Sequence, residues 1–248
     1  MEFKKCLTFV IGSLILLFTN CYFKTRKKTM ETHKKLPLEY VIREPQVRTK
    51  RSPVIFMLHG YGSNEEDLFS FADELPKEYT IISLRAPYNL TSFGYAWYMI
   101  NFDEDQAYWS DNEQAIESRE LIMRCIDEAC KVYDLDTRNI NLLGFSQGSI
   151  LSMAIAISYP KKIRRVIALS GYLNEDILKD GYKKENHSAT HFYVSHGTSD
   201  QVIPVEWDRK TPEFLKSIGA KCTYEEFPIG HGVSPQNFYS FREWLSKY

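Results

Sequence analysis

The stretch Ile140-Asn-Leu-Leu-Gly-Phe-Ser-Gln-Gly-Ser149 decides the fold of this chain. An apolar run leads into Gly144-Phe-Ser-Gln-Gly148, and the mostly apolar residues 150–157 that follow favour a helix. A strand, a G-x-S-x-G turn and a helix in this order lift a serine hydroxyl above the end of a sheet. Glycine suits the two outer positions because it has no Cβ atom to collide with neighbouring backbone. The pattern nominates Ser146 as a nucleophile, and the alternative is a simple Gly/Ser loop between strand and helix.

Two further residues complete a candidate proton relay. Asp200 lies in a polar turn just after the apolar run 191–195, and His231 stands between two glycines after the last apolar run. The order Ser, Asp, His is one of those in which such triads occur along a chain. We therefore predict Ser146 as nucleophile, His231 as general base and then acid, and Asp200 as the carboxylate that orients it. Taken singly, Asp200 could be a turn residue and His231 a solvated loop residue, while His196 competes with His231 and is given a supporting role.

A candidate oxyanion site lies near the start of the domain. The buried-strand run 53–58 is followed by His59-Gly-Tyr-Gly-Ser63, a loop whose glycines allow backbone amides to turn inward. A tetrahedral intermediate needs two backbone N–H groups, one just after the nucleophile and one from an early strand–helix loop. These are predicted to be the N–H groups of Gln147 and Tyr61. The alternative is an ordinary turn.

The combined motifs resemble the carboxylesterase/phospholipase family that includes the acyl-protein thioesterases. The resemblance implies a single-domain α/β-hydrolase, with a mostly parallel sheet, helices on both faces and no large lid. It also implies hydrolysis of carboxylic esters or thioesters. Ser149 and Tyr61 depart from the usual glycine and leucine of the family, which puts the shape of the acyl site in question. The matching pieces are Leu58-His-Gly-Tyr-Gly62, Arg85-Ala-Pro87, Gly94-Tyr-Ala-Trp-Tyr98, Gly144-Phe-Ser-Gln-Gly148, Leu169-Ser-Gly171, His196-Gly-Thr-Ser-Asp200, Val202-Ile-Pro204 and Gly230-His231.

An aromatic segment, residues 93–102, follows the Arg85-Ala-Pro87 motif. By the family resemblance this loop borders the substrate groove, so Trp97 and Tyr98 are predicted to wall an acyl chain. The alternative is ordinary packing of aromatic side chains. The acidic continuation 103–106 is predicted to be a solvated loop.

The N-terminus carries a different kind of signal. Residues 1–20 have a basic start and a short apolar middle, which is the plan of a signal peptide, and the apolar run is shorter than the roughly twenty residues of a membrane span. Cys21 stands at the processing point, as in bacterial lipoproteins. We predict a lipid anchor at Cys21, a basic tether over residues 21–37 and a location in the bacterial cell envelope. An uncleaved anchor and plain secretion are the alternatives.

Alternating strand and helix patterns over residues 38–248 predict one α/β domain. The predicted strands are 38–43, 54–58, 80–84, 139–143, 165–169, 191–195 and 222–227. The predicted helices are 64–74, 111–133, 147–158, 206–218 and 234–246.

Composition argues against several other functions. The chain has 31 basic and 32 acidic residues, whereas nucleic-acid binding needs a strongly basic face. The six histidines show no metal-ligand spacing, and no metal or cofactor is expected. The five cysteines form no disulfide framework: Cys125, Cys130 and Cys222 are interpreted as buried thiols.

The leading hypothesis is a serine esterase that acts on small or medium acyl esters. Thioesterase or lysophospholipase activity is the nearest alternative. An alternative of another class is a membrane-anchored binding protein that keeps the hydrolase scaffold without catalysis. The sequence leaves the oligomeric state open.

Overall fold

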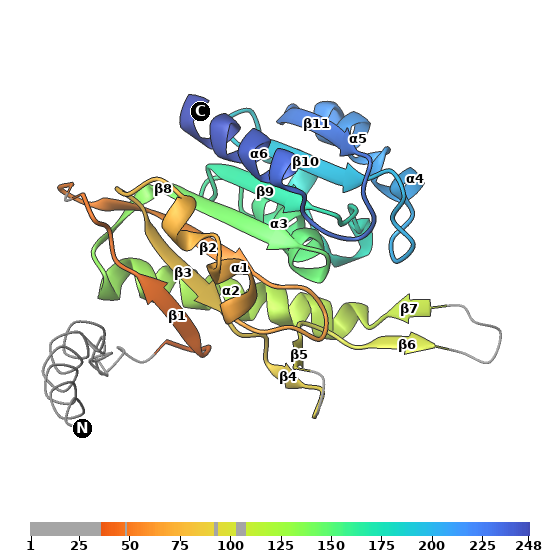
Figure 1. Ribbon diagram of the computed structural model, residues 1–248, viewed down its shortest axis with the longest axis horizontal. Coiled ribbons are helices and arrows are strands. Elements are labelled where there is room, and N and C mark those ends of the chain that lie inside the picture. Colours follow the sequence, from red (N-terminus) through yellow and green to blue (C-terminus); the bar gives the residue numbers. More distant parts are fainter. Residues whose placement is uncertain (1–35, 48, 92–93, 103–107) are drawn as a thin grey trace, which may run out of the picture. The chain divides into compact units, whose positions relative to one another are not determined.

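A computed structural model describes residues 36–47, 49–91, 94–102 and 108–248 (Figure 1). Within these residues the chain forms one compact unit that begins at Leu36, whose side chain is buried in the core. The predicted signal peptide over residues 1–20, Cys21 and the tether as far as residue 35 lie outside the described residues, as does the acidic loop 103–106.

A seven-stranded sheet forms the centre of this unit, with the strand order β1-β3-β2-β8-β9-β10-β11. β1 is antiparallel to β3, and every other neighbouring pair is parallel. The predicted mostly parallel sheet is therefore confirmed. The strands are β1 Tyr40–Arg43, β2 Ser52–Leu58, β3 Thr80–Leu84, β8 Leu135–Phe145, β9 Arg165–Leu169, β10 His191–Gly197 and β11 Lys221–Phe227.

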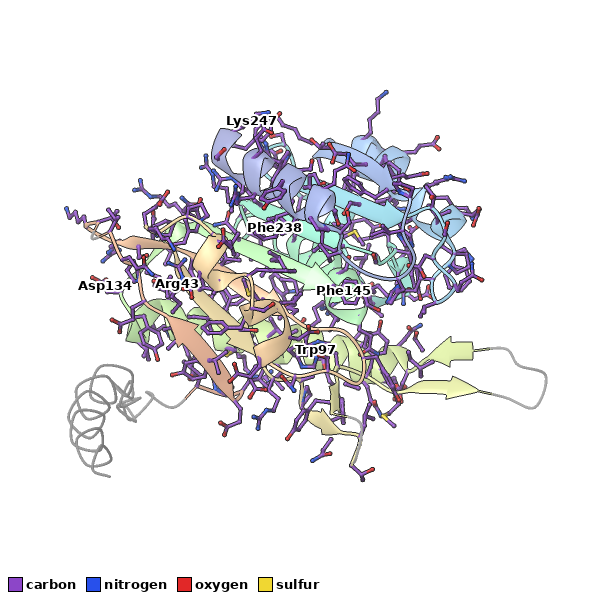
Figure 2. The ribbon with its side chains drawn as sticks, in the orientation of Figure 1. Arg43, Trp97, Asp134, Phe145, Phe238 and Lys247 are labelled. Carbon is purple, nitrogen blue, oxygen red and sulfur yellow. The ribbon has the colours of Figure 1, made fainter. Side chains whose placement is uncertain are left out.

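Helices cover both faces of the sheet, as predicted (Figure 1). Alternate residues of β2 point to opposite faces, as they must on a strand: Phe56 packs on the side of α2 and α3, and Met57 packs on the side of α1 and α6. Side chains fill both layers, with Trp97 in the first and Phe238 in the second (Figure 2). The helices are α1 Glu66–Phe69, α2 Asn112–Val132, α3 Gln147–Ser158, α4 Val205–Asp208, α5 Thr211–Ser217 and α6 Pro235–Lys247.

Two predicted helices are shorter than the pattern indicated. The predicted helix 64–74 is a short α1 followed by a 3₁₀ turn, Ala72–Glu74. The predicted helix 206–218 is split into α4 and α5, because Pro212 has no N–H and fits only the first turn of a helix. Two small hairpins were not predicted; they consist of β4 Tyr88–Asn89 with β5 Tyr95–Ala96, and β6 Ile100–Phe102 with β7 Tyr108–Ser110.

Among the described residues, no helix is long and apolar enough to cross a membrane. In the same part of the chain, no group of three or more His, Cys, Asp or Glu side chains could hold a metal ion.

Candidate active site

Ser146 lies on the sharp turn between β8 and α3. Its backbone has φ 53° and ψ −118°, a conformation that L-residues rarely adopt and that costs of the order of 1–3 kcal/mol. Its N–H donates to the carbonyl of Leu169 at 2.9 Å, which ties the turn to β9. A Cβ atom on Gly144 would lie 2.2 Å from the carbonyl oxygen of Gly148, and one on Gly148 would lie 1.9 Å from that of Leu58. Only glycine fits at either position, so the two glycines make this turn possible.

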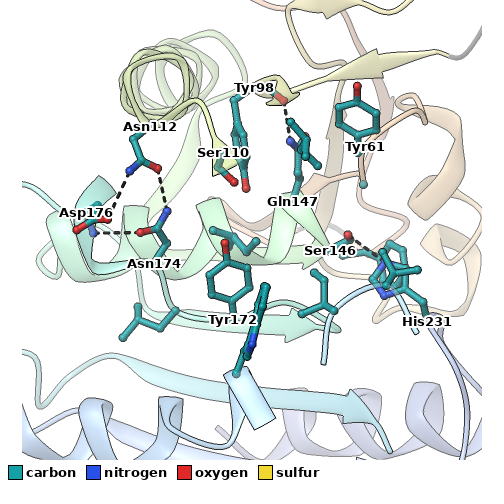
Figure 3. Close-up of a pocket in the computed structure, with 18 of the residues that line it drawn as sticks. Tyr61, Tyr98, Ser110, Asn112, Ser146, Gln147, Tyr172, Asn174, Asp176 and His231 are labelled. Carbon is teal, nitrogen blue, oxygen red and sulfur yellow. Dashed lines mark hydrogen bonds between the residues drawn. The ribbon is translucent and has the colours of Figure 1, made fainter. Parts of the chain in front are cut away.

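The structure brings Ser146, His231 and Asp200 together. Figure 3 shows the side chains of Ser146 and His231 facing each other. Nε2 of His231 lies 3.0 Å from the Ser146 Oγ, and its Nδ1 lies 2.7 Å from Oδ2 of Asp200. An ionised carboxylate only accepts hydrogen bonds, so Nδ1 carries the proton and Nε2 is free to accept the serine proton. The arrangement has the geometry of a nucleophile, a base and a group that orients the base.

The remaining carboxylate oxygen of Asp200 is also satisfied. Its Oδ1 accepts the N–H groups of Val202 at 2.8 Å and Ile203 at 2.9 Å. Burial alone would raise the pKa of Asp200, but the hydrogen bonds from His231, Ile203 and Val202 outweigh it and lower the pKa below its usual value. Asp200 is therefore ionised at neutral pH, as an orienting carboxylate must be.

The two candidate oxyanion donors border the same cavity as Ser146. Gln147 is the first residue of α3, where backbone N–H groups have no partner within the helix and the helix dipole favours negative charge. The side chain of Gln147 makes separate contacts, because it accepts the N–H of Trp97 at 3.1 Å and donates to the carbonyl of Tyr98 at 2.7 Å (Figure 3). Tyr61 lies in the loop after β2.

His59 supports this loop, a role that the sequence did not reveal. Its buried ring lies 2.7 Å from the carbonyl oxygen of Gly60 through Nδ1 and accepts the N–H of Ala86 at 3.1 Å through Nε2. Burial lowers the pKa of His59, so the ring is neutral and donates through Nδ1. The sequence signal for this role was the position of His59 next to Gly60 in the H-G-Y-G motif.

The groove prediction is wrong for Trp97 and consistent with the position of Tyr98. Trp97 is fully buried, its indole N–H donates to the carbonyl of His59 at 2.9 Å, and it is not among the described residues that line the cavity. Tyr98 lines the cavity. The Trp97 ring instead packs against the ring of His59, with centroids 5.4 Å apart, so it supports the loop after β2 rather than the groove.

The cavity has a volume of about 950 Å³ and two different ends. Ser146 and His231 lie at one end, and the polar side chains of Asn112, Asn174 and Asp176 lie at the other (Figure 3). Aromatic and aliphatic side chains form much of the remaining wall. They include Tyr98, Ile100, Ile150, Tyr172, Leu173, Val202, Ile203 and Trp207.

Tyr172 and Trp207 are two cavity aromatics that sequence reasoning missed. Their rings meet edge to face with centroids 5.3 Å apart. Tyr172 follows the Leu169-Ser-Gly171 motif, which was a signal that the next residues border the site, whereas Trp207 was assigned to a helix with no indication of which way it faced.

Comparison with known proteins agrees with the geometry. The model of the Phospholipase/Carboxylesterase family matches residues 40–248. The chain belongs to this family. Its fold and family membership make it a serine hydrolase with esterase-type chemistry.

Individual relatives are distant. An acyl-protein thioesterase 1 of Emericella nidulans is 28% identical over 219 residues, which cover 80% of this chain and 91% of the relative. A probable carboxylesterase of Oryza sativa subsp. japonica is 30% identical over 146 residues, which cover 56% of this chain and 52% of the relative, about half its length. The crystal structure of the Bacillus cereus carboxylesterase aligns with a TM-score of 0.73 and 22% identity over 85% of this chain and 94% of that one. This structural likeness shows the shared fold.

Proposed function

We propose that this chain hydrolyses carboxylic esters through Ser146, His231 and Asp200, by way of an acyl-enzyme. The observation that carries the proposal is the pair of hydrogen bonds from Ser146 Oγ to His231 Nε2 at 3.0 Å and from His231 Nδ1 to Asp200 Oδ2 at 2.7 Å. A serine hydroxyl is a weak nucleophile, and this arrangement supplies the base that activates it.

The steps follow from the positions of the atoms. His231 Nε2 takes the Ser146 proton as Oγ bonds to the ester carbonyl carbon, and the N–H groups of Gln147 and Tyr61 stabilise the negative charge on the carbonyl oxygen. The C–O bond to the alcohol then breaks, and His231 gives its proton to the leaving alcohol oxygen. Water repeats the sequence: His231 takes its proton, the hydroxide oxygen bonds to the acyl carbon, and Ser146 Oγ leaves with the proton from His231.

The shape of the cavity supports small or medium acyl groups. An aliphatic chain that starts at Ser146 would run along Tyr98, Tyr172 and Trp207 and end against polar side chains. Covering these partly exposed polar groups with a longer apolar chain would remove them from water, which is unfavourable. A thioester substrate is the nearest alternative, since the Emericella nidulans relative is named an acyl-protein thioesterase. Lysophospholipids are a further alternative, because the family name includes phospholipases.

We further propose that residues 1–20 act as a signal peptide and that Cys21 carries a lipid. The basic start, the short apolar run and the position of the cysteine support an envelope lipoprotein that meets its substrates at a membrane. Plain secretion is the second choice. Mass spectrometry of the N-terminal peptide from a bacterial membrane fraction tests this: a diacylated Cys21 supports it, and an unprocessed Met1 contradicts it.

Labelling with a fluorophosphonate probe separates the enzyme from the non-catalytic binding protein. The wild-type chain is expected to form a covalent adduct at Ser146, and Ser146→Ala is expected to lose both the adduct and esterase activity by roughly a thousand-fold or more. Ser246→Ala, which alters a hydroxyl on the exposed face of α6, is the matched control and is expected to label like the wild type. A wild-type chain that folds but does not label would overturn the proposal and favour the binding protein.

A further inference from the structure

A second histidine, besides His231, lies next to the Asp200 carboxylate. His196 is at the end of β10, and its side chain is completely buried, as are those of Asp200 and Asp208. Nε2 of His196 lies 3.3 Å from Asp200 Oδ2 and 2.9 Å from the carbonyl oxygen of Ile203. Its Nδ1 lies 3.2 Å from Oδ2 of Asp208, the last residue of α4.

These contacts determine where protons must be. Nε2 of His196 faces two acceptors, the Ile203 carbonyl and the Asp200 carboxylate, so it carries a proton. Nδ1 faces the carboxylate of Asp208, and a hydrogen bond there requires one further proton shared by the pair. With that proton on Nδ1, His196 is an imidazolium between two carboxylates.

The electrostatic surroundings keep this proton on the pair. Burial disfavours the His196 cation, but its hydrogen bonds to Asp208 and Ile203 and the charge of Asp200 outweigh burial and raise the pKa of His196. Burial also raises the pKa of Asp208, so both directions retain a proton on the pair. The other titratable or polar groups that face the pair are Cys222, Tyr224 and Glu226 on β11, Thr211 on α5 and His231 beyond β11, with Glu226 itself paired to Arg209 at 2.7 Å.

We propose that His196 and Asp208 form a buried ion pair that positions Asp200 and limits its attraction for the proton of His231. Oδ2 of Asp200 accepts the hydrogen bond of His231 at 2.7 Å and lies within ion-pair distance of His196 Nε2, at 3.3 Å. A cation on His196, next to this carboxylate, offsets part of its negative charge. His231 therefore loses its proton more readily and remains a competent base at lower pH. The inference rests on the proposed function, because it concerns the same relay.

The test is the pH profile of kcat/KM for Asp208→Asn. The introduced amide can donate to Nδ1 while Nε2 of His196 keeps its proton toward Ile203, so both hydrogen bonds survive and His196 becomes neutral. The positive charge of His196, the charge of the pair that lies nearer to Asp200, is then lost. Asp200 therefore attracts the His231 proton more strongly. The acidic half-point of kcat/KM is expected to rise by about half a pH unit or more. Asp127→Asn is the control, since it removes one carboxylate from the exposed Lys162 pair and is expected to leave the profile unchanged.

The outcomes separate the possibilities. If the pH profile of Asp208→Asn superimposes on that of the wild type, the proposed ion pair is wrong. A variant that loses thermal stability while its acidic half-point stays unchanged would also contradict the proposal, because Asp208 would then have a structural role only. A wild-type chain without esterase activity would instead refute the proposed function.

A second measurement does not depend on turnover or on the folding of Asp208→Asn. NMR spectra of wild-type protein labelled with ¹⁵N-histidine are expected to show, at neutral pH, that both ring nitrogens of His196 are protonated. The resonances of His196 are assigned by their loss in His196→Gln. A neutral ring would contradict the proposal.

Discussion

At the scale of the residue, Asp200 connects the parts of this site. Its Oδ1 holds the loop after β10 through two backbone N–H groups, and its Oδ2 accepts the hydrogen bond of His231 and lies 3.3 Å from Nε2 of His196. The sequence predicted Ser146, Asp200 and His231 because motif and chain order suffice to nominate them. It did not predict Asp208, since only the fold brings the end of α4 against the end of β10.

Replacing Asp200 by asparagine tests its role as the orienting carboxylate. The amide removes the negative charge that stabilises the His231 imidazolium and can favour the wrong tautomer, so kcat is expected to fall by about ten-thousand-fold. KM is expected to change little, because Asp200 is not among the described residues that line the cavity. Steady-state kinetics with a p-nitrophenyl ester measures both, and Asp180→Asn on an exposed turn serves as the control. A drop of less than tenfold would count against the assignment.

The lowered pKa of Asp200 also predicts how stability depends on pH. A carboxyl whose folded pKa lies below its unfolded value of about 4 stabilises the fold above that pH, and this stabilisation is lost as the pH falls through the folded pKa. Between pH 5 and 3, the free energy of unfolding of the wild type is expected to decrease more steeply than that of Asp200→Asn. Urea unfolding at stepped pH measures the difference, and parallel curves for the two proteins would disprove it.

At the scale of the element, strands were easier to predict than helices and hairpins. Residues 80–84 and 165–169 are strands with the predicted bounds, since buried parallel strands are short continuous apolar runs. Predicted helix 147–158 also has the bounds of α3. The hairpins of residues 88–110 were missed because they depend on contacts with distant segments, such as the bond between Trp97 N–H and Gln147.

The side chain of Gln147 is predicted to fasten this hairpin segment to the start of α3. Gln147→Ala leaves the buried N–H of Trp97 and the carbonyl of Tyr98 without these partners, which costs about 1–3 kcal/mol for each unsatisfied group. The backbone N–H of residue 147 remains, so the loss is expected mainly in the free energy of unfolding and in KM rather than in kcat. Chemical denaturation and steady-state kinetics test this. A large fall in kcat at unchanged stability would contradict it.

At the scale of the whole molecule, the site lies at the edge of the sheet where the parallel strands end. Tyr61, Ser146, Asp200 and His231 follow the carboxyl ends of β2, β8, β10 and β11, the edge at which ligands bind in open α/β sheets. Chain order and the predicted strands were therefore enough to predict that these residues lie close together. The far wall of the cavity was not predictable, because it comes from irregular segments after β9 and from the short helix α4.

The two-ended cavity predicts an optimum in acyl length. In a series of p-nitrophenyl esters from acetate to palmitate, assayed below their aggregation limits, kcat/KM is expected to rise to medium chains and then to fall, because longer chains reach the polar end at Asn112 and Asn174. Trp207→Ala removes part of the apolar wall. It is expected to raise KM several-fold for medium esters, because each Å² of acyl surface that is no longer buried costs about 25 cal/mol of binding free energy. KM for the acetate ester is expected to stay nearly unchanged. Tyr239→Ala, an exposed aromatic on α6, is the matched control. A steady rise through palmitate, or an equal effect of Trp207→Ala on acetate, would show that the acyl chain does not lie along this cavity.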